Sequence, residues 1–375
     1  IYVSVNFMTY TKKEKTELFE KIWVVKKSDD KKGAWWWWFW LFFIDNPKDP
    51  DKPHQLMILW STKNEKEIAC NNKVFKFPNK INIGTNKSDF DGVVAVWYFD
   101  GKMHDDYILE KAKIAVTKNP YSLTSDSENN TSFYEKDGKF KVIINRGKKQ
   151  FNFDLSIDEK DNIAKPNYSS ASFLGGLKHY SALGIPKVDF TGTITDSKKE
   201  KIKGTAYFQY VVVNVPSPSW YWGIFHFEKG SILSYFNPHV GPAILKGNLT
   251  NKFIEHGNIS ASTDLYFFNQ KTRKKEQFKI KSIKNKKNSL GEPVFVIKAE
   301  NKNEKISFEV DCYGSSYWEF KKTNFGFLKT TLKYNEYPAK IRNFVIEDKK
   351  GNVLMDSKDL GEGVGNAEHT WGFLP

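Results

Sequence analysis

Residues 33–45, GAWWWWFWLFFID, constrain the fold of this 375-residue chain more than any other stretch. Residues 35–44 are all apolar, with Gly33 shortly before them and Asp45, Asn46 and Pro47 directly after. Aromatic side chains between turn formers favour one long β-strand over a helix, and the stretch is about half as long as a membrane-spanning helix. Alternate side chains of a strand point to opposite faces, so this strand must be covered on both sides. We therefore expect it to lie between a barrel or sandwich interior and a second sheet or domain.

Short strand candidates separated by turn signals recur along the rest of the chain. Asp91-Gly92, Asp100-Gly101 and Asp137-Gly138 are typical hairpin turns, and residues 55–61 are expected to pair antiparallel with the aromatic strand. Sustained helical periodicity is almost absent from the first half. The pattern predicts an all-β sandwich or barrel.

The length of the chain and a repeated pattern indicate two domains. Residues 219–236 hold a second Trp-Tyr-Trp strand with a hairpin partner, which echoes residues 35–61 and indicates an internal duplication. We expect an N-terminal extension over residues 1–32, a first barrel over residues 33–200 and a second barrel over residues 201–375.

The net charge of +14 comes almost entirely from lysine, because Arg146, Arg273 and Arg342 are the only arginines. Proteins that read nucleic acids usually rely on arginine for bidentate contacts, so no nucleic-acid partner is expected. The densest basic run is residues 271–287. We interpret it first as a solvated strand face and second as a patch that touches anionic membrane headgroups.

Several common site types are missing from the sequence. Cys70 and Cys312 stand far apart, and the seven histidines show no metal-ligand spacing, so we expect no disulfide framework, no metal and no cofactor. No nucleophile elbow, phosphate loop or dinucleotide fingerprint occurs. The sequence does not specify the cellular compartment. The chain begins at Ile1, so we keep three alternatives: a cytoplasmic protein, a protein exported after removal of a leader, and a protein in peripheral contact with a membrane.

Four groups of residues together resemble one family. They are the tryptophan-rich residues 35–38; His179-Tyr180-Ser181 with residues 188–194 and Gly204-Thr205-Ala206-Tyr207; Tyr317-Trp318-Glu319; and residues 365–373, GNAEHTWGF. In order and spacing they are similar to the family of carotenoid 1,2-hydratase (hydroxyneurosporene synthase), the AttH-like proteins and some fungal Diels-Alderases.

The resemblance implies two lipocalin-like (calycin-type) antiparallel β-barrels packed side by side, with an apolar cavity for isoprenoid or polyketide-like molecules. One position departs from the family pattern. Where the family has Trp-x-Asp-His, this chain has Tyr207-Phe208-Gln209-Tyr210, so the acidic and basic pair is absent there.

Acid-catalysed hydration or cyclisation of an alkene needs a proton donor in an apolar pocket, where burial keeps a carboxylic acid protonated and aromatic faces stabilise a cation. The catalytic candidates, in order, are Glu319 between Trp318 and Phe320, Glu368 beside His369, and Asp311. For each glutamate, a structural carboxylate that accepts hydrogen bonds is the alternative. His179 and His226 are weaker candidates for proton transfer at a cavity mouth.

Aromatic residues make up 16% of the chain and favour apolar or sugar-stacking pockets. We expect the ligand to contact Trp36, Trp38, Tyr180, Tyr207, Trp220, Trp222, Tyr317 and Trp318. The first hypothesis is a binder of a long apolar ligand, isoprenoid, carotenoid or other lipid, with hydratase, lyase or cyclase activity left open. The alternatives are a carbohydrate-binding or glycan-processing β protein and a purely structural interaction module.

Overall fold

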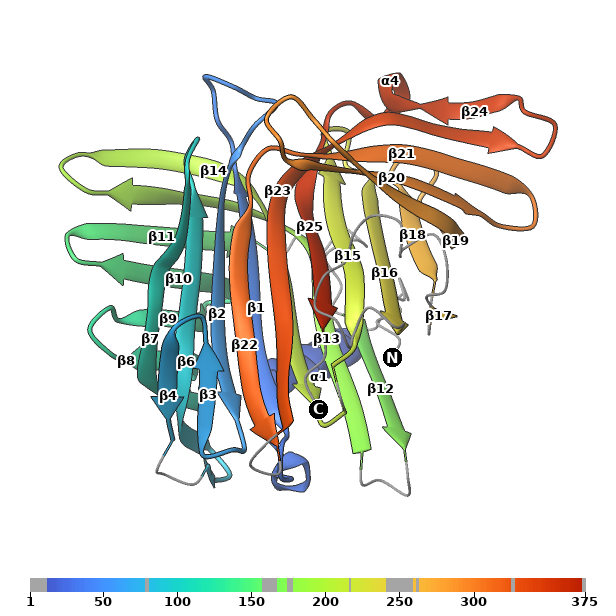
Figure 1. Cartoon of the computed structure of the whole chain (residues 1–375). Helices are drawn as coiled ribbons and strands as arrows, with labels where there is room; N and C mark the ends of the chain where they lie inside the picture. Colours follow the sequence, from blue (N-terminus) through green and yellow to red (C-terminus); the bar gives the residue numbers. More distant parts are fainter. Residues whose placement is uncertain are drawn as a thin grey trace.

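The computed structural model describes residues 12–77, 81–156, 167–173, 178–215, 217–240, 259–260, 263–324 and 328–372. The helical elements among them are short: α1 (Lys12–Glu20), η1 (Lys21–Trp23), η2 (Lys27–Asp29) and α4 (Ser357–Leu360). Nearly everything else is antiparallel strand, arranged as two barrels side by side (Figure 1). The predicted all-β class with two barrels is confirmed.

The first barrel is a 12-stranded sheet among the described residues, in the order β11-β10-β9-β8-β7-β6-β2-β1-β14-β13-β12, with β5 beside β6. Pairing between β11 and β13 closes it. Its strands are β1 (Trp35–Ile44), β2 (His54–Lys63), β5 (Asn82–Ile83), β6 (Lys87–Phe99), β7 (Met103–Lys118), β8 (Tyr121–Asp126), β9 (Thr131–Lys136), β10 (Lys139–Arg146), β11 (Lys149–Ser156), β12 (Asn167–Phe173), β13 (Lys178–Thr195) and β14 (Lys199–Val213). The boundary expected at residue 200 falls inside β14, which pairs along its length with β1.

The second barrel is a 13-stranded sheet among the described residues, in the order β21-β20-β19-β18-β16-β15-β25-β23-β22-β3-β4, and pairing between β21 and β23 closes it. Its strands are β3 (Glu67–Cys70), β4 (Lys73–Lys76), β15 (Ser219–Phe227), β16 (Ile232–Val240), β17 (Ile259–Ser260), β18 (Asp264–Asn269), β19 (Lys274–Lys287), β20 (Pro293–Glu300), β21 (Glu304–Cys312), β22 (Ser316–Asn324), β23 (Leu328–Asp348), β24 (Val353–Asp356) and β25 (Gly363–Gly372).

The two barrels repeat one strand order, as an internal duplication predicts. Each aromatic strand, β1 or β15, lies between its hairpin partner, β2 or β16, and the last strand of its barrel, β14 or β25. The next neighbour is a long strand, β13 or β23, that also closes the barrel. The correspondence puts β1 and β15 in equivalent places.

The strand β1 is covered on both faces, as its composition requires. Trp36, Trp38 and Trp40 are fully buried in the core inside the first barrel. The residues between them face outward, and Phe39 and Leu41 belong to a second core that is shared with the other barrel. The described residues therefore form one core inside each barrel, one core between the barrels and a smaller cluster on β13 and β14.

The N-terminal segment packs into the core of the first barrel. Trp23 packs against Phe133, with ring centroids 4.6 Å apart and the rings tilted by 37°, and Ile22 is fully buried. Trp38 donates its indole N–H to the Ile22 carbonyl at 2.8 Å, and Tyr210 donates its hydroxyl to the Val24 carbonyl at 2.9 Å. The interior of this barrel is thus filled with protein side chains.

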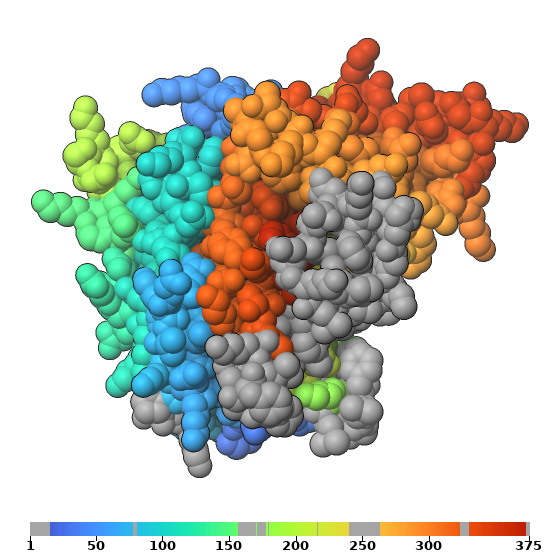
Figure 2. All heavy atoms as spheres, viewed as in Figure 1, coloured from blue at the N-terminus to red at the C-terminus, as the bar shows by residue number. Residues whose placement is uncertain are grey.

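The hairpin of β3 and β4 links the two barrels. It follows β2 in the chain, yet β3 pairs with β22 of the second barrel through Phe320↔Cys70 and Lys321↔Ala69. Asn71 strengthens the contact, since its backbone N–H donates to the Glu319 carbonyl at 2.8 Å. In the space-filling view the blue surface of this hairpin lies against the orange surface of β22 (Figure 2).

The basic run forms the exposed strand β19. Three of its lysines pair with carboxylates of neighbouring strands: Lys279 with Asp264, Lys281 with Glu300 and Lys286 with Glu309. These pairs fit the interpretation of a solvated strand face. No helix among the described residues is long and apolar enough to cross a membrane.

Candidate functional site

A cavity of about 200 Å³ lies between the two barrels. Its first-barrel wall includes Trp37 and Phe39 of β1, and its second-barrel wall includes Trp220 and Trp222 of β15. The β22 residue Trp318 adds a further ring. The expected apolar cavity is therefore present, but it is formed by the outer faces of both barrels, because side chains fill the interiors.

Two carboxyl groups line this mostly apolar cavity. Glu336 of β23 lies directly opposite Glu368 of β25 in the antiparallel register. Side chains at such positions lie on the same face of the sheet with their Cβ atoms about 5 Å apart. Glu336 is fully buried and Glu368 is 8% exposed.

Aromatic side chains hold both carboxyl groups through hydrogen bonds. Trp220 donates its indole N–H to Glu368 Oε2 at 2.7 Å, and Tyr334 donates its hydroxyl to Glu368 Oε1 at 2.7 Å. Trp97 reaches across from the first barrel and donates its indole N–H to Glu336 Oε2 at 2.7 Å. The pair is thus oriented by donors from both barrels.

Burial raises the pKa of both carboxyl groups. The pKa of Glu336 lies well above its usual value because the group is desolvated and because Glu368 adds a second negative charge nearby. Burial raises the pKa of Glu368 to about 7, while hydrogen bonds from Trp220 and Tyr334 act in the opposite direction. At neutral pH we therefore expect Glu336 to carry a proton and Glu368 to titrate.

The arrangement can carry out acid–base chemistry on an uncharged molecule. Two neighbouring carboxyl groups with different pKa values divide naturally into a proton donor and a proton acceptor. The rings of Trp37, Trp220 and Trp222 present faces that attract positive charge.

Five of the residues predicted from the sequence meet at the cavity. Glu368, Tyr180, Trp220, Trp222 and Trp318 all line it. Tyr207 lies directly behind this wall: its ring centroid is 5.3 Å from that of Trp222, and its hydroxyl donates to Gln209 Oε1 at 2.8 Å. Gln209, which departs from the family pattern, lines the cavity as a neutral amide.

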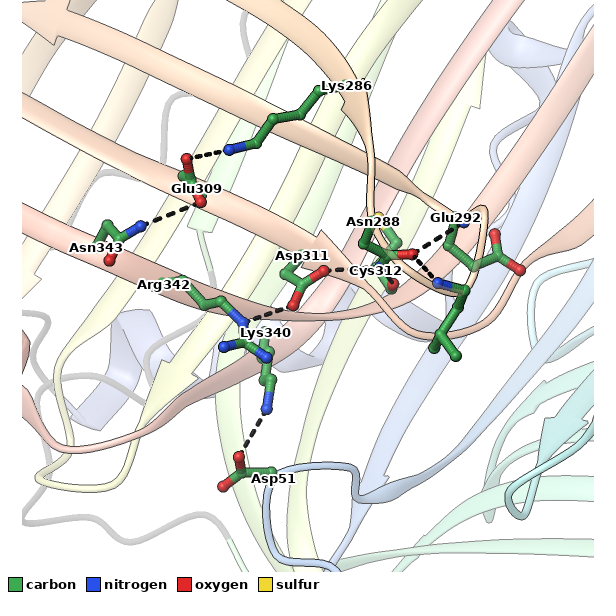
Figure 3. A network of polar contacts seen from close by, with 11 residues as sticks. Asp51, Lys286, Asn288, Glu292, Glu309, Asp311, Cys312, Lys340, Arg342 and Asn343 are labelled. Atoms are coloured by element: carbon green, nitrogen blue, oxygen red, sulfur yellow. Dashed lines mark hydrogen bonds and ion pairs between the residues drawn. The ribbon is translucent and has the colours of Figure 1, made fainter.

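The first and third catalytic candidates lie elsewhere. Glu319 does not line the cavity: it alternates with Trp318 and Phe320, which do, and it forms an ion pair with Lys321 at 2.7 Å. Asp311 belongs to a polar network on the outer side of the second barrel, where it pairs with Arg342 at 2.5 Å and accepts from Asn288 at 2.8 Å (Figure 3). The ion pair of Glu319 fits the structural role that was its alternative.

Three predicted ligand contacts also lie outside the cavity lining. Trp36 and Trp38 point into the first barrel, because side-chain alternation along β1 sends Trp35 and Trp37 to the cavity instead. Tyr317 is 39% exposed and alternates away from Trp318. On β1, the predicted contacts Trp36 and Trp38 are each one position away from the residues that line the cavity, Trp35 and Trp37.

Sequence reasoning missed Glu336, Tyr334 and Trp97. A signal for the first two was present, because Tyr334 and Glu336 are two residues apart and share one face of any strand. That Glu336 opposes Glu368 depends on the pairing of β23 with β25, which no local pattern specifies.

Among the described residues, no histidine lines the cavity. His226 is buried, and its ring nitrogens contact Thr205 Oγ1 at 2.7 Å and the Pro186 carbonyl at 2.8 Å. The His179 side chain lies outside the described part of the chain. Among the described residues, no three histidine, cysteine or carboxylate side chains are grouped to hold a metal ion.

Comparison with known proteins finds several similar solved structures, among them the following two. One is a "putative AttH" from Nitrosomonas europaea, with 12% identity and a TM-score of 0.46 over 92% of this chain and 96% of that chain. The other is kievitone hydratase from Nectria haematococca, with 11% identity and a TM-score of 0.41 over 93% of each chain. No family model and no curated protein match the sequence. The first of these structures bears the AttH name that the resemblance in the sequence predicted.

Proposed function

We propose that this protein is a hydratase-type enzyme that adds water to, or cyclises, an uncharged apolar alkene bound between its two barrels. The observation that carries the proposal is the carboxyl pair Glu336 and Glu368, which is buried in an aromatic cavity and opposed across β23 and β25. A buried carboxylic acid that stays protonated at neutral pH can protonate a weakly basic carbon–carbon double bond.

In the proposed reaction, Glu336 donates its proton to one alkene carbon, and the π electrons form the new C–H bond. The other carbon becomes a cation that faces the rings of Trp220 and Trp222. Water then adds to this carbon, and Glu368 accepts the proton that the water loses. The product contains one water molecule more than the substrate.

The size and lining of the cavity limit the classes of substrate that can bind. Its volume of about 200 Å³ is small for a ligand pocket, which favours a compact isoprenoid over a whole carotenoid. Few of its lining side chains are polar, so sugar hydroxyls would find few partners there. The apolar ligand is therefore preferred to the glycan alternative.

The test measures conversion of geraniol, a short neutral isoprenoid alkene, and of any apolar material extracted from the purified protein. Product heavier by one water molecule is expected from the wild-type protein. Glu336→Gln and Glu368→Gln should each lower the rate by about 100-fold or more, because each removes one proton-transfer group. Glu319→Gln is the matched control outside the cavity and should keep full activity. Equal rates in all four proteins would refute the assignment.

A further inference from the structure

A row of buried polar side chains leads from Glu336 along the interface between the barrels. Asn366 lies two residues before Glu368 on β25, so both side chains face the interface, and Asn366 is diagonal to Glu336 on β23. Gln55 of the first barrel comes next: its amide Nε2 donates to the Gly365 carbonyl at 2.8 Å. Gln55, Glu336 and Asn366 are all 0% exposed.

Each of these three side chains has polar atoms without a hydrogen-bond partner. Glu336 Oε1, both side-chain polar atoms of Asn366 and Gln55 Oε1 are buried and unpartnered. One such atom costs about 1–3 kcal/mol, and three neighbouring residues of this kind are hard to reconcile with a dry interface. Buried water commonly satisfies such groups and typically makes about three hydrogen bonds.

The outer end of the row lies at the loop between β1 and β2. Gln55 Nε2 also donates to Tyr313 Oη at 2.8 Å, and Tyr313 in turn donates to the Pro53 carbonyl at 3.2 Å. Nearby, Lys340 pairs with Asp51 at 2.7 Å, and the Asp51 side chain is 53% exposed (Figure 3). The row thus leads from the cavity toward the loop between β1 and β2, where Asp51 is exposed to solvent.

We propose that Gln55, Asn366 and Glu336 bind a chain of ordered water that carries protons between solvent and Glu336. The water site follows from the unpartnered atoms alone. Its use in catalysis rests on the proposed function, in which each turnover leaves Glu336 ionised and Glu368 protonated, so Glu336 must regain a proton and Glu368 must release one to solvent. A proton would pass from solvent along the water chain to the Glu336 carboxylate, and each water would accept one proton and release another.

The experiment uses the whole chain and two measurements that need no substrate. The first is a high-resolution crystal structure of the wild-type protein, which should show water within hydrogen-bond distance of Asn366, Gln55 Oε1 and Glu336 Oε1. The second is the rate at which the protonated carboxyl band in the infrared spectrum shifts after transfer to D₂O. In Asn366→Val this exchange should be about tenfold slower, because the water chain loses its central amide.

Two further variants support this comparison. Gln55→Leu tests a second position in case Asn366→Val folds poorly, and it should also slow the exchange. Asn335→Val is the matched control, because Asn335 lies on β23, is 7% exposed and donates to the His369 carbonyl instead of belonging to the row. Its exchange rate should equal that of the wild-type protein.

A dry row in the crystal, or equal exchange rates in all folded variants, would overturn this inference. Failure of the proposed function would look different. If neither Glu336 nor Glu368 affects turnover, but water fills the row and exchange slows in Asn366→Val, the water site stands and only its catalytic use is lost.

Discussion

Trp97 of the first barrel donates its indole N–H to Glu336 of the second barrel, with a nitrogen–oxygen distance of 2.7 Å. The tryptophan lies on β6 and the glutamate on β23, and both are fully buried. The bond therefore joins the two barrels and also orients one of the two cavity carboxyl groups. The interface and the site therefore share this hydrogen bond.

Trp97→Phe should change both stability and titration. The variant loses the hydrogen bond to Glu336 and should lower the free energy of unfolding by about 1–3 kcal/mol. Because this bond lowers the Glu336 pKa, its loss should raise that pKa further. Trp60→Phe is the control, since Trp60 bonds Thr131 inside the first barrel, and it should lower stability without moving the carboxyl titration. An unchanged titration in Trp97→Phe would contradict the assigned contact.

The stability of the protein should fall as the pH rises from about 5 to 8. The folded-state pKa of Glu368, about 7, is higher than its ordinary value of 4.5, so the folded state holds this proton more tightly than the unfolded state. The stabilisation is complete below pH 4.5 and is lost as the pH rises through 7. It amounts to roughly 3 kcal/mol for this group. Urea denaturation at several pH values measures it, and Glu368→Gln should flatten the profile. A wild-type slope retained in that variant would count against the buried pair.

Filling the cavity should weaken ligand binding without touching the carboxyl groups. Ala95 lines the cavity and is 3% exposed, so Ala95→Leu places extra methyl groups in the ligand volume. Quenching of tryptophan fluorescence by geraniol should need about tenfold more ligand in this variant, a loss typical of a steric clash. Ala115→Leu, on the outward face of the adjacent β7, is the control and should bind as the wild-type protein does. Equal affinities in both variants would place the ligand elsewhere.

Removing the Trp23 side chain from the core of the first barrel should destabilise the fold but leave ligand binding in the cavity unchanged. Trp23 packs against Phe133 and Tyr121, and it is 3% exposed. Trp23→Ala should cost about 3–5 kcal/mol of unfolding free energy, as truncation of a large buried ring usually does. Denaturation and geraniol titration separate the two effects. Unchanged stability would show that residues 12–25 do not contribute to the core.

The fold was largely predictable because its signals are local. The run of rings on β1, the turn pairs and the second Trp-Tyr-Trp strand on β15 specify strands, hairpins and a repeat by themselves. The boundary predicted at residue 200 falls inside β14, because the pairing of β14 with β1 is long-range. Likewise, β3 looks like an ordinary strand of the first half, and only its contact with β22 assigns it to the other barrel.

The site was only partly predictable, because one of its two carboxyl groups is placed by long-range strand pairing. Glu368 was identified from neighbouring aromatic residues and a family-like closing motif, whereas its partner Glu336 depends on the β23–β25 register. Glu319 has rings on both sides in sequence, but those rings face the cavity and strand alternation turns Glu319 away. Neighbours in sequence were thus a poor guide to burial on a strand.

The most direct test of the account is an infrared titration of the buried carboxyl groups in the wild-type protein, Glu336→Gln and Glu368→Gln. We expect a protonated carboxyl band that persists at pH 6, that titrates near pH 7 in part, and that loses intensity in each variant. Absence of this band from the wild-type protein at pH 6 and above would mean that both groups ionise normally. The carboxyl pair would then not be a proton donor at neutral pH.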